Sequence, residues 1–150
     1  GITVSGLSAG GKGRFVTSNA RITVENCVFG SLAAKTSNGP ITLSGVTGGD
    51  CEAASNNARI TAEHCRFAEK LWMQTSNGPV RAEDVEAPDL TFKTANAAIT
   101  GTVVGDMRDY AISSRTSNAQ NNLPMDCAYE DQAKRLWATT SNGRIDVRFV

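Results

Sequence analysis

Few residues of this chain have side chains suited to chemistry, and they are scattered along it. His64 is the single histidine among 150 residues, so a His-rich metal site is disfavoured and a catalytic triad would depend on one residue. Glu63 and Glu83 are the best candidates for a pair of carboxylates doing acid–base work. Trp72 and Trp137 are the two tryptophans and the best candidates for a binding surface. Which of these residues meet depends on the elements that carry them.

A repeat organises the whole sequence. Each unit contains a variant of Thr-Ser-Asn-Gly-x-Ile, as at 36–41 and 140–145. The asparagine of this motif, called the marker asparagine below, recurs at spacings of 19, 19, 20, 19, 22 and 24 residues. The marker asparagines are Asn19, Asn38, Asn57, Asn77, Asn96, Asn118 and Asn142. Residues 1–5 are similar to the second half of a unit, so we expect the chain to belong to a larger protein.

Apolar and polar residues alternate around each marker asparagine. The sixth, fourth and second positions before Asn77 hold Leu71, Met73 and Thr75, and the positions between them are polar or amphipathic. Apolar residues also recur at the third and fifth positions after the marker. Because successive side chains of a strand point to opposite faces, each unit predicts two short strands with one buried face. The residue directly after the marker is always Gly or Ala, which indicates a tight corner.

Two short strands cannot bury their apolar face alone, so neighbouring units must stack on one another. Stacking also explains why the same residue type recurs at the same point of every unit. We therefore predict an all-β, single-domain parallel β-solenoid of about seven coils over residues 1–150, right-handed by the general crossover bias. The marker asparagines should form a ladder of side-chain amides at one corner, with each bond contributing about 1 kcal/mol.

The recurring motif resembles that of a bacterial adhesin-like domain-of-unknown-function family, similar in style to the head GIN adhesin-like domains. The resemblance rests on Thr17-Ser18-Asn19 and on the Thr-Ser-Asn-Gly segments at 36–39, 75–78 and 140–143. It implies a bacterial, cell-envelope-associated and non-catalytic β-solenoid. The family has no catalytic residues to carry over. A cytoplasmic location is the alternative.

The four cysteines fit the core better than they fit disulfides. Cys27 and Cys65 lie eight positions after a marker asparagine, in a column otherwise filled by Val46, Val85 and Val104. They would lie two coils apart, about 9.6 Å, whereas a disulfide needs Cα atoms within about 7 Å. Cys51 falls in the leucine column, and a bridge to Cys65 on the adjacent coil is disfavoured. Cys127 lies in the longest unit.

Charge and composition exclude several classes of protein. Lys and Arg total 15 and Asp and Glu total 15, which argues against a nucleic-acid-binding protein and a polybasic membrane-surface domain. No apolar run approaches the roughly 20 residues of a transmembrane helix. The sequence contains no phosphate-binding loop, nucleophile elbow or calcium-loop motif. We therefore expect no cofactor and no metal.

Glu63 and Glu83 should be neighbours in one outward column, which Glu25 continues. Arg59 and Arg81 lie close to them in the repeat. This mixture of charges predicts a salt-bridged solvent face, so we assign no catalytic residue. A polysaccharide-active enzyme that uses this outward acidic pair is the alternative.

The other outward face is the predicted binding site. Trp72 and Trp137 lie five positions before a marker asparagine, while Gln74, Lys93 and Arg115 lie three positions before one. We expect the tryptophans to lie about three coils apart, roughly 14–15 Å along the axis. Exposed aromatic residues beside basic ones fit a protein or glycan partner.

Two alternatives to a binding face remain. The segment 121–134 could cover both tryptophans, which would make them part of the core. The domain could also be a sensor or assembly module that self-associates through its open ends or its faces.

Overall fold

The computed structural model describes residues 2–105, 110–121 and 134–149, and the regular elements it contains are all strands. The strands in chain order are β1 (Ile2–Ser5), β2 (Ser8–Thr17), β3 (Ile22–Glu25), β4 (Val28–Thr36), β5 (Ile41–Ser44), β6 (Thr47–Ala54), β7 (Ile60–Glu63), β8 (Arg66–Gln74), β9 (Val80–Val85), β10 (Asp89–Lys93), β11 (Ile99–Val103), β12 (Tyr110–Arg115), β13 (Lys134–Thr139) and β14 (Ile145–Phe149). The described residues form no helix that could span a membrane.

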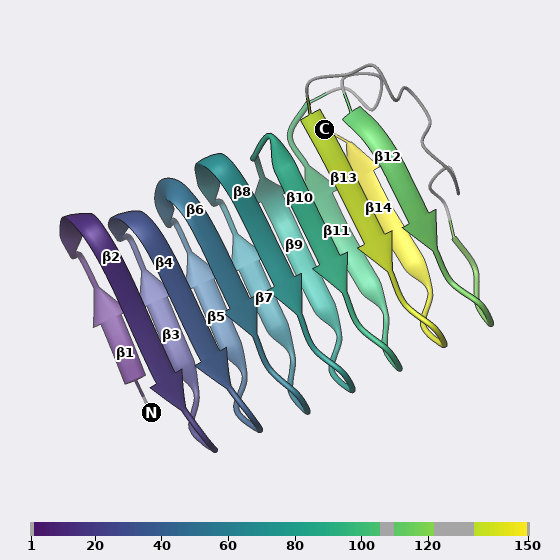
Figure 1. Cartoon of the computed structure of the whole chain (residues 1–150), viewed down its shortest axis with the longest axis horizontal. Helices are drawn as coiled ribbons and strands as arrows, with labels where there is room; N and C mark the ends of the chain where they lie inside the picture. Colours follow the sequence, from purple (N-terminus) through teal and green to yellow (C-terminus); the bar gives the residue numbers. More distant parts are fainter. Residues whose placement is uncertain (1, 106–109, 122–133, 150) are drawn as a thin grey trace.

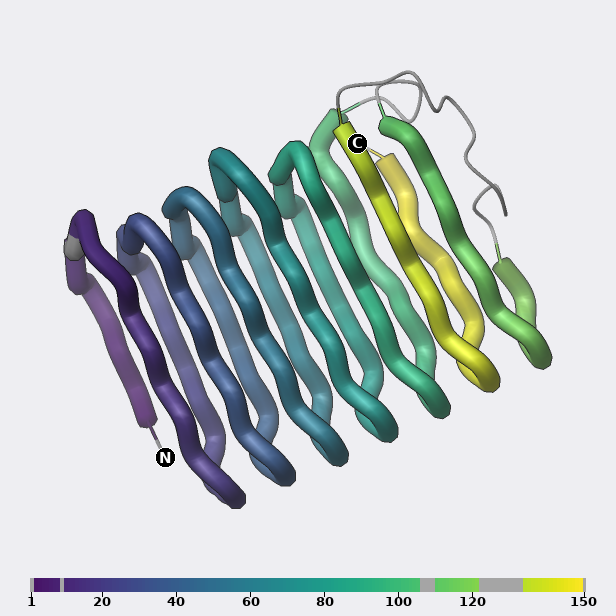
Figure 2. Tube along the Cα trace, viewed as in Figure 1, coloured from purple at the N-terminus to yellow at the C-terminus, as the bar shows by residue number. Residues whose placement is uncertain are grey.

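The strands form two parallel sheets that face each other across the core (Figure 1). The first sheet has the order β1-β3-β5-β7-β9-β11-β14, and the second has the order β2-β4-β6-β8-β10-β13-β12. The chain runs up one sheet and down the other as it advances along the axis, which makes a right-handed coil (Figure 2). The predicted parallel β-solenoid is therefore confirmed.

The last two coils are stacked out of sequence order. β13 pairs with β10 on one side and with β12 on the other, so the final coil lies between two earlier ones. About five turns follow one another in the order of the sequence. The count therefore differs slightly from the predicted number of about seven coils. The last two units also do not stack in the order of the sequence.

The inward columns predicted from the repeat form one continuous core. Leu71 and Met73 of β8 and Ile22 and Val24 of β3 are fully buried, whereas Ile2 and Val4 of the first coil are only partly buried. One column differs from the prediction, since Val103 rather than Val104 pairs with Val85. The register of β11 shifts by one residue between Gly101 and Val103, and a spacing rule cannot anticipate such an irregularity.

The predicted ladder of marker asparagines is present at one corner. From Asn38 onward, the Nδ2 group of each asparagine donates to the Oδ1 atom of the asparagine before it in the ladder, at 2.5–2.8 Å. The order along the ladder is Asn19, Asn38, Asn57, Asn77, Asn96, Asn142 and Asn118. These side chains are exposed, so the ladder is a surface feature. Its order independently shows the insertion of the final coil.

A second ladder of hydroxyl groups lies just inside the same corner. For every marker after Asn19, the Ser or Thr two positions before it donates to the carbonyl of the residue after the marker in the adjacent coil. Thr75 donates in this way to Ala58 at 3.0 Å, and Thr94 to Gly78 at 2.9 Å. Thr140 continues the series to Ala97 at 3.0 Å. Since Thr75, Thr94 and Thr140 are buried, these bonds satisfy polar groups that could not reach water.

Glycine and alanine alternate strictly along the stack in the position after the marker. The spatial order is Ala20, Gly39, Ala58, Gly78, Ala97, Gly143 and Ala119. A Cβ atom added to Gly143 would lie 1.8 Å from the carbonyl oxygen of Ala97, and one added to Gly39 or Gly78 would lie 2.1 Å from the corresponding oxygen. Alternate coils therefore need glycine. In sequence order Ala119 would follow Ala97 directly, and inserting Gly143 between them preserves the alternation.

The cysteines within the described residues are core side chains. Cys27, Cys51 and Cys65 are buried and carry free thiols, as predicted. Burial raises the pKa of the Cys51 and Cys65 thiols. Cys127 lies outside the described residues.

Replacing Asn77 with Ala should lower the free energy of unfolding by about 1–2 kcal/mol, because it removes two ladder bonds and leaves Asn57 and Asn96 each without one partner. Urea denaturation measures this effect. The matched control is Asn56→Ala, since Asn56 is exposed and its side chain forms no hydrogen bond with any described residue. Equal midpoints for the two variants would contradict a stabilising ladder.

Paired cysteines test the position of the final coil. In a Cys127→Ser background, Lys93→Cys with Thr139→Cys should form a disulfide on mild oxidation, because these residues are register partners on adjacent strands. Lys93→Cys with Arg115→Cys should not, since two strand steps separate them by about 9.6 Å. Stacking in sequence order would give the opposite result. Mass spectrometry of peptides from non-reduced protein distinguishes the two outcomes.

Candidate functional site

Trp72 and Trp137 lie in one row on the outer face of the second sheet. Thr91 lies between them, since its register partners are Trp72 on β8 and Trp137 on β13. Two strand steps, about 9.6 Å, therefore separate the tryptophans. The predicted separation of three coils was wrong because β13 directly follows β10 in the stack. Trp137 is 49% exposed, while Trp72 is half-buried. Most of the segment 121–134, proposed above as a cover, lies outside the described residues.

The other predicted binding residues occupy the adjacent outward row. Gln74 pairs with Lys93, Lys93 with Thr139, and Thr139 with Arg115. The structure thus brings Gln74 and Lys93 beside the tryptophans. Arg115 lies one strand further from Lys93 than sequence order implied. Thr91 and Thr139 complete the face, although the sequence prediction did not include them among the binding residues.

Two shallow grooves cross this face. The first encloses about 220 Å³ and is lined by Trp72, Gln74, Thr91, Phe92, Lys93, Trp137 and Thr139. The second encloses about 270 Å³ and is lined by Glu52, Lys70, Leu71, Trp72, Asp89 and Thr91. Because Trp72 and Thr91 line both, the grooves adjoin there. Each is smaller than the roughly 300–1,000 Å³ typical of small-molecule sites, so they suit successive units of a longer ligand.

The charges of the two grooves differ. Lys93 is the charged residue that lines the first groove; it is exposed and makes no ion pair with any described residue. In the second groove Lys70 lies among Glu52 and Asp89. The groove between the tryptophans therefore carries one positive charge, that of the unpaired Lys93 side chain. The second groove has side chains of both charges.

One member of the acidic pair predicted on the first sheet, Glu83, forms a surface ion pair. Glu63 and Glu83 are register partners on β7 and β9. Glu83 accepts a hydrogen bond from the Nε group of Arg81 on its own strand, at 2.8 Å, and the two residues also form an ion pair. This arrangement matches the solvent face that the sequence indicated.

Sequence reasoning missed a column of residues at the second corner. Asn26, His64 and Asp84 have φ angles of 52°, 54° and 52°, and Gly6 and Gly45 hold the equivalent positions with positive φ. The signal was present in the sequence, because these residues lie seven positions after successive marker asparagines and Gly, Asn and Asp adopt the left-handed conformation most readily. His64 is therefore placed at the corner by backbone geometry.

His64 and Asp84 form the centre of a charged cluster at this corner. The Nδ1 atom of His64 lies 2.8 Å from Asp84 Oδ2. Arg66 contacts Asp84 Oδ1 at 3.2 Å and Glu86 Oε2 at 3.5 Å. The hydrogen bond with His64, together with the contacts of Arg66, lowers the pKa of Asp84 below its ordinary value of 3.8.

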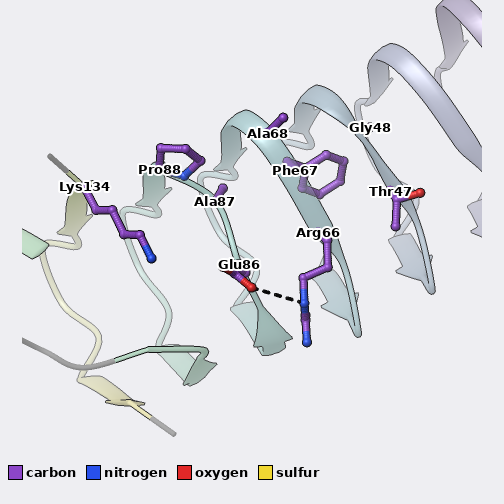
Figure 3. Close-up of a pocket in the computed structure, with 9 residues that line it drawn as sticks. All are labelled: Thr47, Gly48, Arg66, Phe67, Ala68, Glu86, Ala87, Pro88 and Lys134. Carbon is purple, nitrogen blue, oxygen red and sulfur yellow. Dashed lines mark ion pairs between the residues drawn. The ribbon is translucent and has the colours of Figure 1, made fainter. Parts of the chain in front are cut away.

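A hollow of about 470 Å³ lies beside this cluster (Figure 3). Its lining is largely apolar, with Phe67, Ala87 and Pro88, and Arg66 and Glu86 are joined by their ion pair at its edge (Figure 3). Cys65, which follows His64 in the chain, is buried in the core, and burial raises the pKa of its thiol. The Cys65 thiol is therefore unsuited to act as a nucleophile beside His64 and Asp84.

Comparison of the chain with protein-family models, with characterised proteins and with solved structures finds no match. The function must therefore be argued from the geometry of the chain itself.

Asp84→Asn tests the corner cluster without straining the backbone, because Asn26 already adopts the same conformation in this column. The lowered pKa means that ionised Asp84 stabilises the fold above pH 3.8. That contribution disappears as the pH falls below 3.8 through the folded-state value. The difference in unfolding free energy between wild type and variant should therefore be larger at pH 6 than at pH 2.5.

Urea denaturation at both pH values gives this difference. Glu69→Gln is the matched control, because Glu69 is an exposed acid without an ion pair to any described residue. A difference for Asp84→Asn that does not change with pH would show that the cluster contributes no stability through the ionisation of Asp84.

Proposed function

We propose that the domain is a non-catalytic binding module that holds an extended ligand on the outer face of the second sheet. The observation that supports this function best is the row Trp72, Thr91 and Trp137, with a groove between the two tryptophans. Tryptophan offers a large, rigid apolar surface with a polar edge, and it is enriched at sites that dominate binding energy. The adhesin-like resemblance and a cell-envelope location belong to the same proposal.

The rigidity of the scaffold supports binding rather than chemistry. β8, β10 and β13 lie inside the sheet, and each has a hydrogen-bonded neighbour on both sides. Their outward side chains are thus held in fixed rows, which suits a preorganised binding surface. The alternative enzyme would use Glu63 and Glu83, but the ion pair of Glu83 with Arg81 favours a solvated charge network.

Replacing Trp137 or Trp72 with Ala should weaken binding to a glycan surface by about 1–3 kcal/mol. Depletion assays on cellulose, chitin and pectate gels measure the affinity of each variant. The unfolding midpoint of Trp137→Ala should stay close to wild type, because nearly half of the side chain is already exposed. Val16→Ala is the control, since Val16 is 56% exposed on the outer face of the same sheet but lies on β2.

Two results would contradict the proposal. One is equal binding by wild type and both tryptophan variants. The other is the failure of folded wild-type protein to bind any of the three surfaces.

A further inference from the structure

We propose that the ligand is an acidic, extended β-1,4-linked polysaccharide that lies along the solenoid axis and crosses β8, β10 and β13. Alternate sugar rings would stack on Trp72 and Trp137, and the carboxylate of the ring between them would contact Lys93. This inference rests on the binding function proposed above and names its ligand class and direction.

The spacing of Trp72 and Trp137 indicates the direction in which the glycan lies on the sheet. The tryptophans are two strand steps apart across the strands, about 9.6 Å, with the small side chain of Thr91 between them. In an extended β-1,4-linked chain, rings two apart present the same face in the same direction, at a comparable repeat. A glycan lying along the axis therefore places one ring on each tryptophan and a third over Thr91. A glycan lying along a strand would meet one tryptophan only.

The volume and charge of the groove give the ligand class. The groove between the tryptophans encloses about 220 Å³, which suits a single sugar ring. Its other lining side chains include Gln74 and Thr139, which can hydrogen-bond hydroxyl groups. Lys93 supplies an exposed ammonium group that no described residue neutralises. An unpaired cation over a one-ring groove is complementary to a uronic acid rather than to a neutral sugar.

An acidic peptide fits this face less well. Peptides that bind sheets do so by adding a strand at an open edge, where backbone groups are free. β8, β10 and β13 are interior strands whose backbones already pair on both sides. A peptide on this face would have to satisfy its backbone groups from side chains alone, whereas sugar hydroxyls bind side chains and water readily.

Isothermal titration calorimetry with two matched oligosaccharides tests the inference. The probes are cellohexaose and cellouronic acid hexamer, in which each C6 hydroxymethyl group is replaced by a carboxylate. Wild type should bind the acidic hexamer at least tenfold more tightly than the neutral one, because a hydrogen bond to a charged group contributes about 1.5–3 kcal/mol and 1.4 kcal/mol is tenfold. Lys93→Gln should remove this preference, so that the variant binds the two hexamers with affinities that differ by less than about twofold.

Lys35→Gln is the matched control, because Lys35 is exposed in the same outward row but lies on β4, away from the tryptophans. It should leave the preference intact, which separates a local contact from an effect of net charge. Length tests the direction: the cellouronic acid trimer should bind at least tenfold more tightly than the dimer, and Trp137→Ala should abolish that gain. If Trp72→Ala fails to fold, Trp72→Phe and the exposed Trp137 still test the stacking.

Three results would overturn this inference. Equal affinity for the two hexamers in wild type would refute the acidic ligand while leaving a tryptophan-dependent binding module intact. Equal affinity for dimer and trimer would refute the axial direction. Tryptophan-dependent binding of poly-glutamate without binding of either hexamer would assign the face to an acidic peptide, whereas binding that no tryptophan variant changes would refute the binding function as well.

Discussion

The close vertical stacking of coil corners is the constraint on which the rest of the structure depends. Each coil must bring its corner near enough for the carbonyl after one marker asparagine to accept a bond from the hydroxyl of the next coil, as between Ala58 and Thr75 at 3.0 Å. At that distance a methyl group on every coil would clash, since a Cβ on Gly78 would lie 2.1 Å from the oxygen of Ala58. The alternation of glycine and alanine follows. Once the corners are fixed, the two strands leaving each corner must pair in register.

Register in turn decides what the surface presents. Because strands stay aligned across the second sheet, side chains at equivalent positions form straight rows across it, and a row can change chemistry from one strand to the next without disturbing the core. Trp72, Thr91 and Trp137 occupy such a row, while the residues beside them on each strand, such as Leu71 and Leu136, remain buried. The proposed binding face thus differs in side-chain type from strand to strand, while the buried side chains beneath it stay apolar.

Much of this could be predicted from the sequence, because a repeat carries its own register. The inward columns, the asparagine ladder and the outward direction of Trp72 and Trp137 all follow from counting positions around the marker. The order in which the coils stack cannot be predicted in this way, because the spacing of the repeats does not indicate which two units are neighbours in space. Counting positions also cannot predict the register shift that pairs Val103 rather than Val104 with Val85, because this shift arises from a local irregularity near Gly101. The sequence analysis did not predict the charged cluster of His64 and Asp84, because the residues of its column share a positive φ angle rather than one residue type.

The insertion of the final coil connects the fold to the proposed function. Stacked in sequence order, β12 would lie beside β10, and Ser113 rather than Trp137 would follow Thr91 in the outward row. Lys93 and Arg115 would then be direct neighbours with like charges, which is unfavourable on adjacent strands. Insertion of β13 places Thr139 between these two cations and brings Trp137 opposite Thr91. The groove between the tryptophans therefore exists only in the inserted order, and the same glycine that relieves the corner, Gly143, belongs to the coil that completes it.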